Sequence, residues 1–91
     1  MSPPDKDGAA GLDARIIGLL AGVAPDIDPA AIAPDVAFRD QFDFDSMDLL
    51  RFASALHAHF GIDIPEKDYR QLASLAGCRD YVASRLSDGQ Q

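Results

Sequence analysis

Apolar side chains recur at helical spacing in three stretches of the chain. In the first stretch they stand three and four residues apart from Leu12 to Val23, which predicts a helix that ends before Pro25. A second helix is predicted to begin after Asp45, with Asp48 completing a capping box, and to end at Gly61. Its buried stripe is expected to consist of Leu49, Phe52, Ala53, Leu56 and Phe60.

The third stretch lies near the end of the chain. Ser74 is expected to cap a helix whose apolar positions are Leu75, Cys78, Val82 and Leu86. A short helix is predicted over Glu66 to Leu72, because the preceding Pro65 suits the start of a helical turn. The segment from Ala24 to Asp45 contains three prolines and too little periodicity for a long element. The pattern therefore predicts an all-α fold, a four-helix bundle with three longer helices, one short helix and a long loop between the first and second helices.

Both ends of the chain lack apolar periodicity. We expect residues 1–11 and 87–91 to be flexible tails and residues 12–86 to form the folded domain. A chain of 91 residues builds a single small core, which argues against a large self-sufficient enzyme.

The chain is acidic, with 15 Asp and Glu against 8 Lys and Arg and a net charge of -7. Negative charge repels nucleic-acid phosphates and anionic lipid headgroups, so basic protein surfaces are the expected partners instead. The sequence has no apolar run of the ~20 residues that a membrane helix needs, its start does not resemble a secretory signal, and Cys78 has no second cysteine to pair with. We therefore expect a cytoplasmic monomer that does not insert into membranes.

Ser46 is the first candidate for chemistry. It stands at the start of the second predicted helix, where backbone N–H groups and the helix dipole favour a phosphate on its hydroxyl. No His, Lys or Cys lies near it in the sequence to act as a base, so Ser46 is expected to be modified by another enzyme. The alternative is that Ser46 only helps to begin the helix.

Around Ser46 the sequence resembles the acyl carrier protein family, in which the serine of an Asp-Ser-Leu motif receives 4'-phosphopantetheine. Asp45, Ser46 and Met47 stand at this motif, with Met47 in place of Leu. The resemblance covers roughly residues 12–86, and it includes the long first loop, the Phe-Gly-Ile-Asp-Ile-Pro segment at 60–65 and matching positions between 74 and 82.

The resemblance implies a carrier protein rather than an enzyme. A phosphopantetheinyl transferase would attach the arm to Ser46 from coenzyme A, and acyl-activating and acyl-processing enzymes would use acyl groups held as thioesters. The implied role lies in lipid or polyketide-like biosynthesis, fatty acid biosynthesis included. Two alternatives stay open, an aminoacyl or peptidyl carrier and an unmodified acidic helical adaptor that binds a basic protein. Residues that could line a cargo site, or only pack the core, are Leu49, Phe52, Ala53 and Ile64.

Two features depart from the family pattern. The family usually has Leu-Gly shortly before Asp-Ser, but this chain reads Phe42-Asp43-Phe44 before Asp45, which predicts a different loop conformation. The second helix is commonly strongly acidic in the family, whereas here it carries Arg51 and no acid after Asp48. Its partners are therefore expected to differ from those of general fatty-acid synthesis.

Acidic residues are concentrated before and around Ser46, with five aspartates and one arginine between residues 35 and 48. We expect this charge to steer basic enzyme surfaces toward the serine, with a salt-dependent effect. The partner-binding candidates are Asp40, Asp43, Asp48 and Arg51. The alternative for each aspartate is a solvated loop.

No metal site is expected. His57 and His59 are two residues apart, so on a helix their side chains point in different directions. Cys78 is the only other soft ligand, and its apolar helical position predicts a small core side chain.

Overall fold

Three long helices and three short helical segments make up the fold. The structure is a computed structural model that describes residues 4–89. The long helices are α1 (Pro4–Val23), α3 (Ser46–Phe60) and α4 (Leu75–Gly89), and the short segments are η1 (Pro29–Ala31), α2 (Phe38–Gln41) and η2 (Glu66–Leu72). Residues 4–89 contain no strand, which confirms the all-α prediction.

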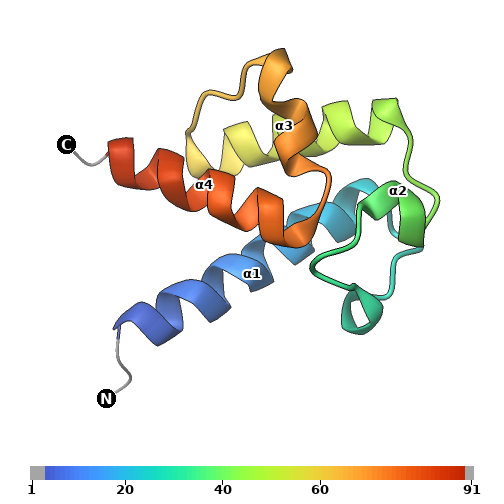
Figure 1. Cartoon of the computed structure of the whole chain (residues 1–91), viewed down its shortest axis with the longest axis horizontal. Helices are drawn as coiled ribbons and strands as arrows, with labels where there is room; N and C mark the ends of the chain where they lie inside the picture. The colour runs from blue at the N-terminus through green and yellow to red at the C-terminus, as the bar shows by residue number, and fades with distance from the viewer. Residues whose placement is uncertain (1–3, 90–91) are drawn as a thin grey trace.

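The helices are arranged so that α1 packs against both α3 and α4, and η2 packs against both α3 and α4. The beginning of α1 and the end of α4 lie at one end of the molecule, while α2 and the beginning of α3 lie at the other end (Figure 1). The start of α3, which carries Ser46, is therefore remote from the two ends of the described chain.

One core is formed by apolar side chains from the long helices, from η2 and from the connecting segments. The predicted stripes supply most of it, since Ile16, Leu20, Phe52, Leu56 and Val82 are fully buried. Among the described side chains, the buried apolar ones are Ile16, Leu20, Ile27, Phe38, Phe44, Phe52, Ala53, Leu56, Ile62, Leu72, Leu75, Cys78, Tyr81 and Val82. The prediction that three periodic stretches face one core is confirmed.

The two ends of α3 have the predicted capping geometry. The Asp48 N–H donates a 2.9 Å hydrogen bond to the Asp45 carboxylate, and the Asp45 N–H donates a 3.2 Å bond to the Asp48 carboxylate. Gly61 ends the helix in the left-handed conformation at φ 69°, where its N–H donates to the His57 carbonyl at 2.8 Å. A residue with a side chain would be strained at that φ, so glycine is required there.

The two outer helices are longer than the apolar pattern predicts. Residues 4–11 and 87–89 were expected in flexible tails, but α1 begins at Pro4 and α4 continues to Gly89. Pro4 suits the first position of a helix, and Ala9 and Ala10 favour helix even where no apolar stripe is present. Residues 1–3 and 90–91 of the expected tails lie outside the described residues, and the 12–86 domain boundary stays a prediction.

The segment between α1 and α3 is more ordered than the long loop expected of it. It contains both η1 and α2, and the Gln41 side chain supplies hydrogen bonds for its backbone. The Gln41 amide accepts from the Ala33 N–H at 2.8 Å and donates to the carbonyls of Ala33 at 2.9 Å and Val36 at 2.8 Å. These bonds satisfy backbone N–H and C=O groups that would otherwise be paired within a regular element.

An aromatic cluster ties this segment to α3. The ring of Phe38 lies 5.6 Å from that of Phe42, 5.4 Å from that of Phe44 and 5.8 Å from that of Phe52. Such ring contacts stabilise the fold in addition to the stabilisation that each ring gives by being buried. The segment that precedes Ser46 is thus held against the core.

Candidate functional site

Ser46 is the first residue of α3, and it is exposed. The capping box places the Asp45 carboxylate on the Asp48 N–H, and the Leu49 N–H donates to the Asp45 carbonyl at 3.0 Å. The start of the helix is therefore fixed from both sides of the serine. Its hydroxyl stands at the positive end of the helix dipole, where a phosphate ester would be stabilised.

A pocket of about 540 Å³ opens beside Ser46. It is formed where α2, the segment before α3, the first turn of α3 and the end of η2 meet. The lining residues are Ala37, Arg39, Phe44, Asp45, Ser46, Leu49, Arg70 and Ala73. The site thus combines an accessible hydroxyl, an apolar wall and two guanidinium groups.

The surface around Ser46 also displays apolar side chains. Met47 is 55% exposed and Leu50 is 42% exposed. Met47 and Leu50 are three residues apart on α3, so they share one face of the helix. Met47 and Leu50 thus form an exposed apolar face on the helix that Ser46 begins.

The predicted acidic residues fall into two groups. Asp40 and Asp43 are exposed and make no ion pair within residues 11–87, the range whose side chains are described. Asp45 and Asp48 instead use their carboxylates in the capping box. Arg51 is exposed on α3 and likewise has no ion-pair partner in that part of the chain.

The four residues predicted as cargo lining do not gather in one place. Leu49 lines the pocket beside Ser46, whereas Phe52 is fully buried in the core. Ala53 and Ile64 line a different pocket of about 520 Å³, together with residues such as Tyr69 of η2. Arg39 and Arg70, which line the Ser46 pocket, were missed because each is a lone arginine on a short element.

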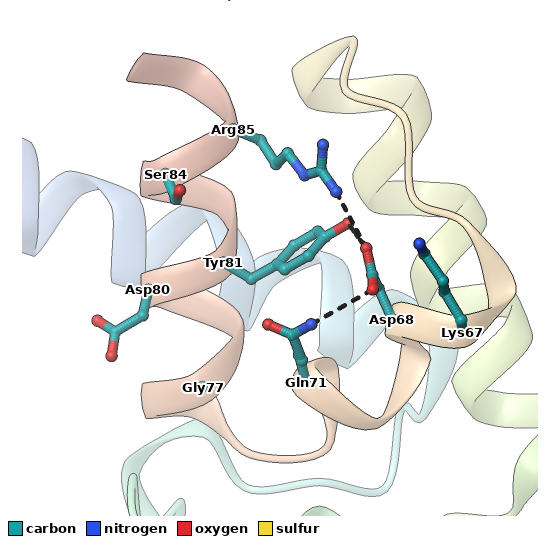
Figure 2. Close-up of a pocket in the computed structure, with 8 residues that line it drawn as sticks. All are labelled: Lys67, Asp68, Gln71, Gly77, Asp80, Tyr81, Ser84 and Arg85. Atoms are coloured by element: carbon teal, nitrogen blue, oxygen red, sulfur yellow. Dashed lines mark hydrogen bonds and ion pairs between the residues drawn. The ribbon is translucent and has the colours of Figure 1, made fainter. Parts of the chain in front are cut away.

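A polar network between η2 and α4 was also missed by the sequence reasoning. Asp68 is buried, and its carboxylate accepts hydrogen bonds from the Tyr81 hydroxyl at 2.8 Å and from the Arg85 guanidinium at 3.0 Å (Figure 2). The hydrogen bond from Tyr81, together with the charge of Arg85, holds the pKa of the Asp68 carboxyl below its ordinary value, although burial opposes them. The network stands beside a cavity of about 700 Å³ and joins η2 to α4.

The two histidines and the cysteine do not line the pocket beside Ser46. His57 Nδ1 lies 2.6 Å from the Ile62 carbonyl, while the His59 ring packs edge-on against Phe60. Cys78 is fully buried, and burial raises the pKa of its thiol to about 12, as expected of a core side chain. Among the described side chains, residues 11–87, no three of His, Cys, Asp or Glu are grouped so that they could hold a metal ion. In the same range, no helix has the length and apolar character that crossing a membrane requires.

Comparison with known proteins assigns the domain to a class. Residues 14–82 match the family model described as "Phosphopantetheine attachment site". The chain is 32% identical over 83 residues to the acyl carrier protein of Thermobifida fusca, covering 90% of this chain and 98% of that protein. It is 31% identical over 71 residues to the acyl carrier protein of Acidothermus cellulolyticus, covering 78% of this chain and 80% of that protein. A third acyl carrier protein, from Thermosynechococcus vestitus, is 25% identical over 61 residues, or 67% of this chain and 75% of that protein.

The helical fold and the matched segment define a phosphopantetheine-carrying domain. The chain belongs to the acyl carrier protein family. Members of this family are carriers rather than enzymes; they hold 4'-phosphopantetheine covalently and interact with phosphopantetheinyl transferases and acyl-processing enzymes. The residues of this chain fit that cofactor, because an exposed serine begins a long helix beside an apolar pocket that also carries two arginines.

Proposed function

We propose that Ser46 is the attachment site of 4'-phosphopantetheine, and that the protein carries acyl intermediates as thioesters in lipid or polyketide-like biosynthesis. The observation that carries this proposal is the exposed position of Ser46 as the first residue of α3, inside the segment that matches the family. Ser74, by contrast, is half-buried and accepts a 3.1 Å hydrogen bond from the Gly77 N–H.

The attachment step belongs to a separate transferase. The Ser46 oxygen forms an ester bond to the phosphorus next to pantetheine in coenzyme A, the diphosphate bond breaks, and 3',5'-ADP leaves with the electron pair. The hydroxyl proton passes to a base of the transferase. Once bound, the cofactor supplies a terminal thiol that forms the thioester. The contribution of this chain is to hold the serine exposed at a fixed helix start.

The residues around Ser46 have distinct roles in this proposal. Asp45 fixes the start of α3, and the exposed Met47 contacts the docking enzyme. Asp40 and Asp43 attract basic partner surfaces, while Asp48 adds its charge from within the capping box. The exposed guanidinium of Arg51 faces an acidic group on the partner. Arg51 thereby favours partners whose acidic group a wholly acidic helix would repel.

We also propose that the carrier acts as a monomer in the cytoplasm. The single core of the described residues supports a monomer. Light scattering at micromolar concentration tests this oligomeric state. The only cysteine is buried as a free thiol, which is consistent with a reducing compartment.

Loading of the modified protein tests the proposed cargo. After treatment with a transferase and coenzyme A, the wild type and the control Ser54→Ala are incubated with ATP and either a fatty-acid-activating or an amino-acid-activating ligase. We expect a hydroxylamine-sensitive acyl adduct from the first ligase, and none with Ser46→Ala. Loading by the amino-acid ligase alone would support an aminoacyl carrier instead. If Ser46→Ala binds partners and functions in cells like the wild type, the protein is an unmodified adaptor.

A further inference from the structure

Two arginines face the pocket beside Ser46 from different elements. Arg39 comes from α2 and Arg70 from η2, while Ser46 begins α3 on the same pocket. Apart from Asp45, the remaining lining is apolar and consists of Ala37, Phe44, Leu49 and Ala73. Two positive charges on a small apolar pocket are the pattern expected where an amphipathic anion binds.

Backbone hydrogen bonds hold the two arginines at the same pocket. The Phe38 N–H, next to Arg39 in the chain, donates to the Ala73 carbonyl at 2.7 Å. The Ala73 N–H in turn donates to the Arg70 carbonyl at 3.2 Å. This chain of two bonds links α2 to the end of η2. It brings the backbones at the two arginines to the same pocket although they are 31 positions apart in the sequence.

Neither arginine is used elsewhere in the described structure. Arg79 pairs with Asp13 at 3.2 Å and Arg85 pairs with Asp68 at 3.0 Å. Arg39 and Arg70 are exposed and form no ion pair with any of the described side chains, residues 11–87. Their guanidinium groups are therefore available to a ligand.

The acidic surroundings of Ser46 make such cations favourable for an anion at this place, in addition to the helix dipole. Asp40 and Asp43 are exposed nearby in the chain, and Asp45 and Asp48 lie at the helix start itself. A phosphate on Ser46 would be repelled by these carboxylates. Asp45, the one acid of the lining, points its carboxylate at the Asp48 N–H. Two guanidinium groups supply the compensating charge.

We propose that Arg39 and Arg70 bind the phosphodiester of the phosphopantetheine arm, and that Phe44 and Leu49 receive the adjacent gem-dimethyl group. The proposal rests on the proposed attachment at Ser46. The phosphate is favoured over an anionic cargo because it is bonded directly to Ser46, a residue of the pocket lining, whereas cargo is carried at the far end of the arm. The base of the arm then lies in the pocket, and only its outer part with the thiol is free to move.

Comparison of the protein with and without the arm tests this inference. The thermal midpoint Tm of both forms is measured for the wild type, the double variant R39Q/R70Q and the control R15Q, which removes an exposed arginine that does not line the pocket. We expect the arm to raise Tm in the wild type and in R15Q, and this rise to be lost in R39Q/R70Q. A change caused only by the arginines themselves would shift both forms equally.

A second measurement needs no variant. In isotope-filtered NMR of the wild type with the arm attached, we expect nuclear Overhauser effects between the gem-dimethyl protons and the side chains of Phe44 and Leu49. If mass spectrometry shows the arm on Ser46 but these effects are absent and the Tm rise is the same in R39Q/R70Q, the inference is overturned while the proposed function stands. If the folded wild type accepts no arm, both are overturned.

Discussion

The Tyr81 hydroxyl donates a 2.8 Å hydrogen bond to the Asp68 carboxylate, and this bond joins η2 to α4. The two residues are 13 positions apart, and Arg85 completes the network with its guanidinium both on Asp68 and 5.0 Å from the centre of the Tyr81 ring. The network holds one side of η2, whose other end carries Arg70 at the Ser46 pocket. The contact between η2 and α4 therefore helps to position Arg70 at the pocket beside Ser46.

Removal of the Tyr81 hydroxyl should destabilise the fold. Tyr81→Phe keeps the buried ring but leaves the Asp68 carboxylate without its shortest hydrogen bond, so we expect Tm to fall by roughly 4–8 °C. The matched control is Tyr69→Phe, because no hydrogen bond of the Tyr69 hydroxyl is present among the described residues. Equal changes in Tm for both variants, measured by circular dichroism, would mean that the network contributes nothing.

The lowered pKa of Asp68 predicts an acid-dependent loss of stability. Because the pKa of this carboxyl in the folded state lies below its ordinary value of 3.8, its contribution is present above pH 3.8 and is lost as pH falls through the lower folded-state pKa. Asp68→Asn should therefore show a smaller decrease in unfolding free energy below pH 3.8 than the wild type. The exposed Asp63 provides the control variant, Asp63→Asn. Parallel pH profiles for the wild type and Asp68→Asn would contradict the assignment.

Glycine-to-alanine substitutions should have opposite effects in α4 and α1. A Cβ atom at Gly77 would stand 2.7 Å from the Gln71 carbonyl oxygen, so Gly77→Ala must displace η2 from α4 and lower stability. A Cβ atom at Gly18 in α1 would meet no atom within 4 Å. Gly18→Ala should therefore stabilise the fold by up to about 1 kcal/mol through helix propensity. Urea unfolding measures both changes, and stabilisation by Gly77→Ala would show that α4 and η2 are not so closely packed.

The exposed aspartates predict a salt-dependent rate of modification. Asp40→Asn combined with Asp43→Asn removes two charges that make no ion pair in the described chain, so modification of Ser46 by a basic transferase should slow by roughly threefold or more at low salt. The difference should disappear at about 0.5 M salt, where screening is strong. The control exchanges Asp26 and Asp63, which are also exposed, for Asn. An equal slowing in the control would indicate a general charge effect rather than steering near the serine.

Local signals made most of the fold predictable from sequence. The pairing of Asp45 with Asp48, the left-handed Gly61 and the Ser74 cap each depend on residues within a few positions, and each is confirmed. The short helix over Glu66 to Leu72 is also confirmed, as a 3₁₀ helix. Such features follow from chain stereochemistry and can be recognised without knowledge of the packing.

The parts that could not be predicted depend on contacts between distant residues. α2 is only four residues long, and it is held by the Phe38 to Ala73 hydrogen bond across 35 positions rather than by its own propensity. The meeting of Arg39 and Arg70 at one pocket depends on that same bond. No local pattern indicates which lone arginine will face another.

Peptide mass spectrometry after enzymatic modification tests the central claim most directly. The folded wild type, Ser46→Ala and Ser54→Ala are incubated with coenzyme A, magnesium and a broad-specificity phosphopantetheinyl transferase, and the modified residue is located by fragmentation. We predict one phosphopantetheinyl group on Ser46 in the wild type and in Ser54→Ala, and none in Ser46→Ala. Folded wild-type protein that stays unmodified with several transferases, or that is modified at another residue, would contradict the account.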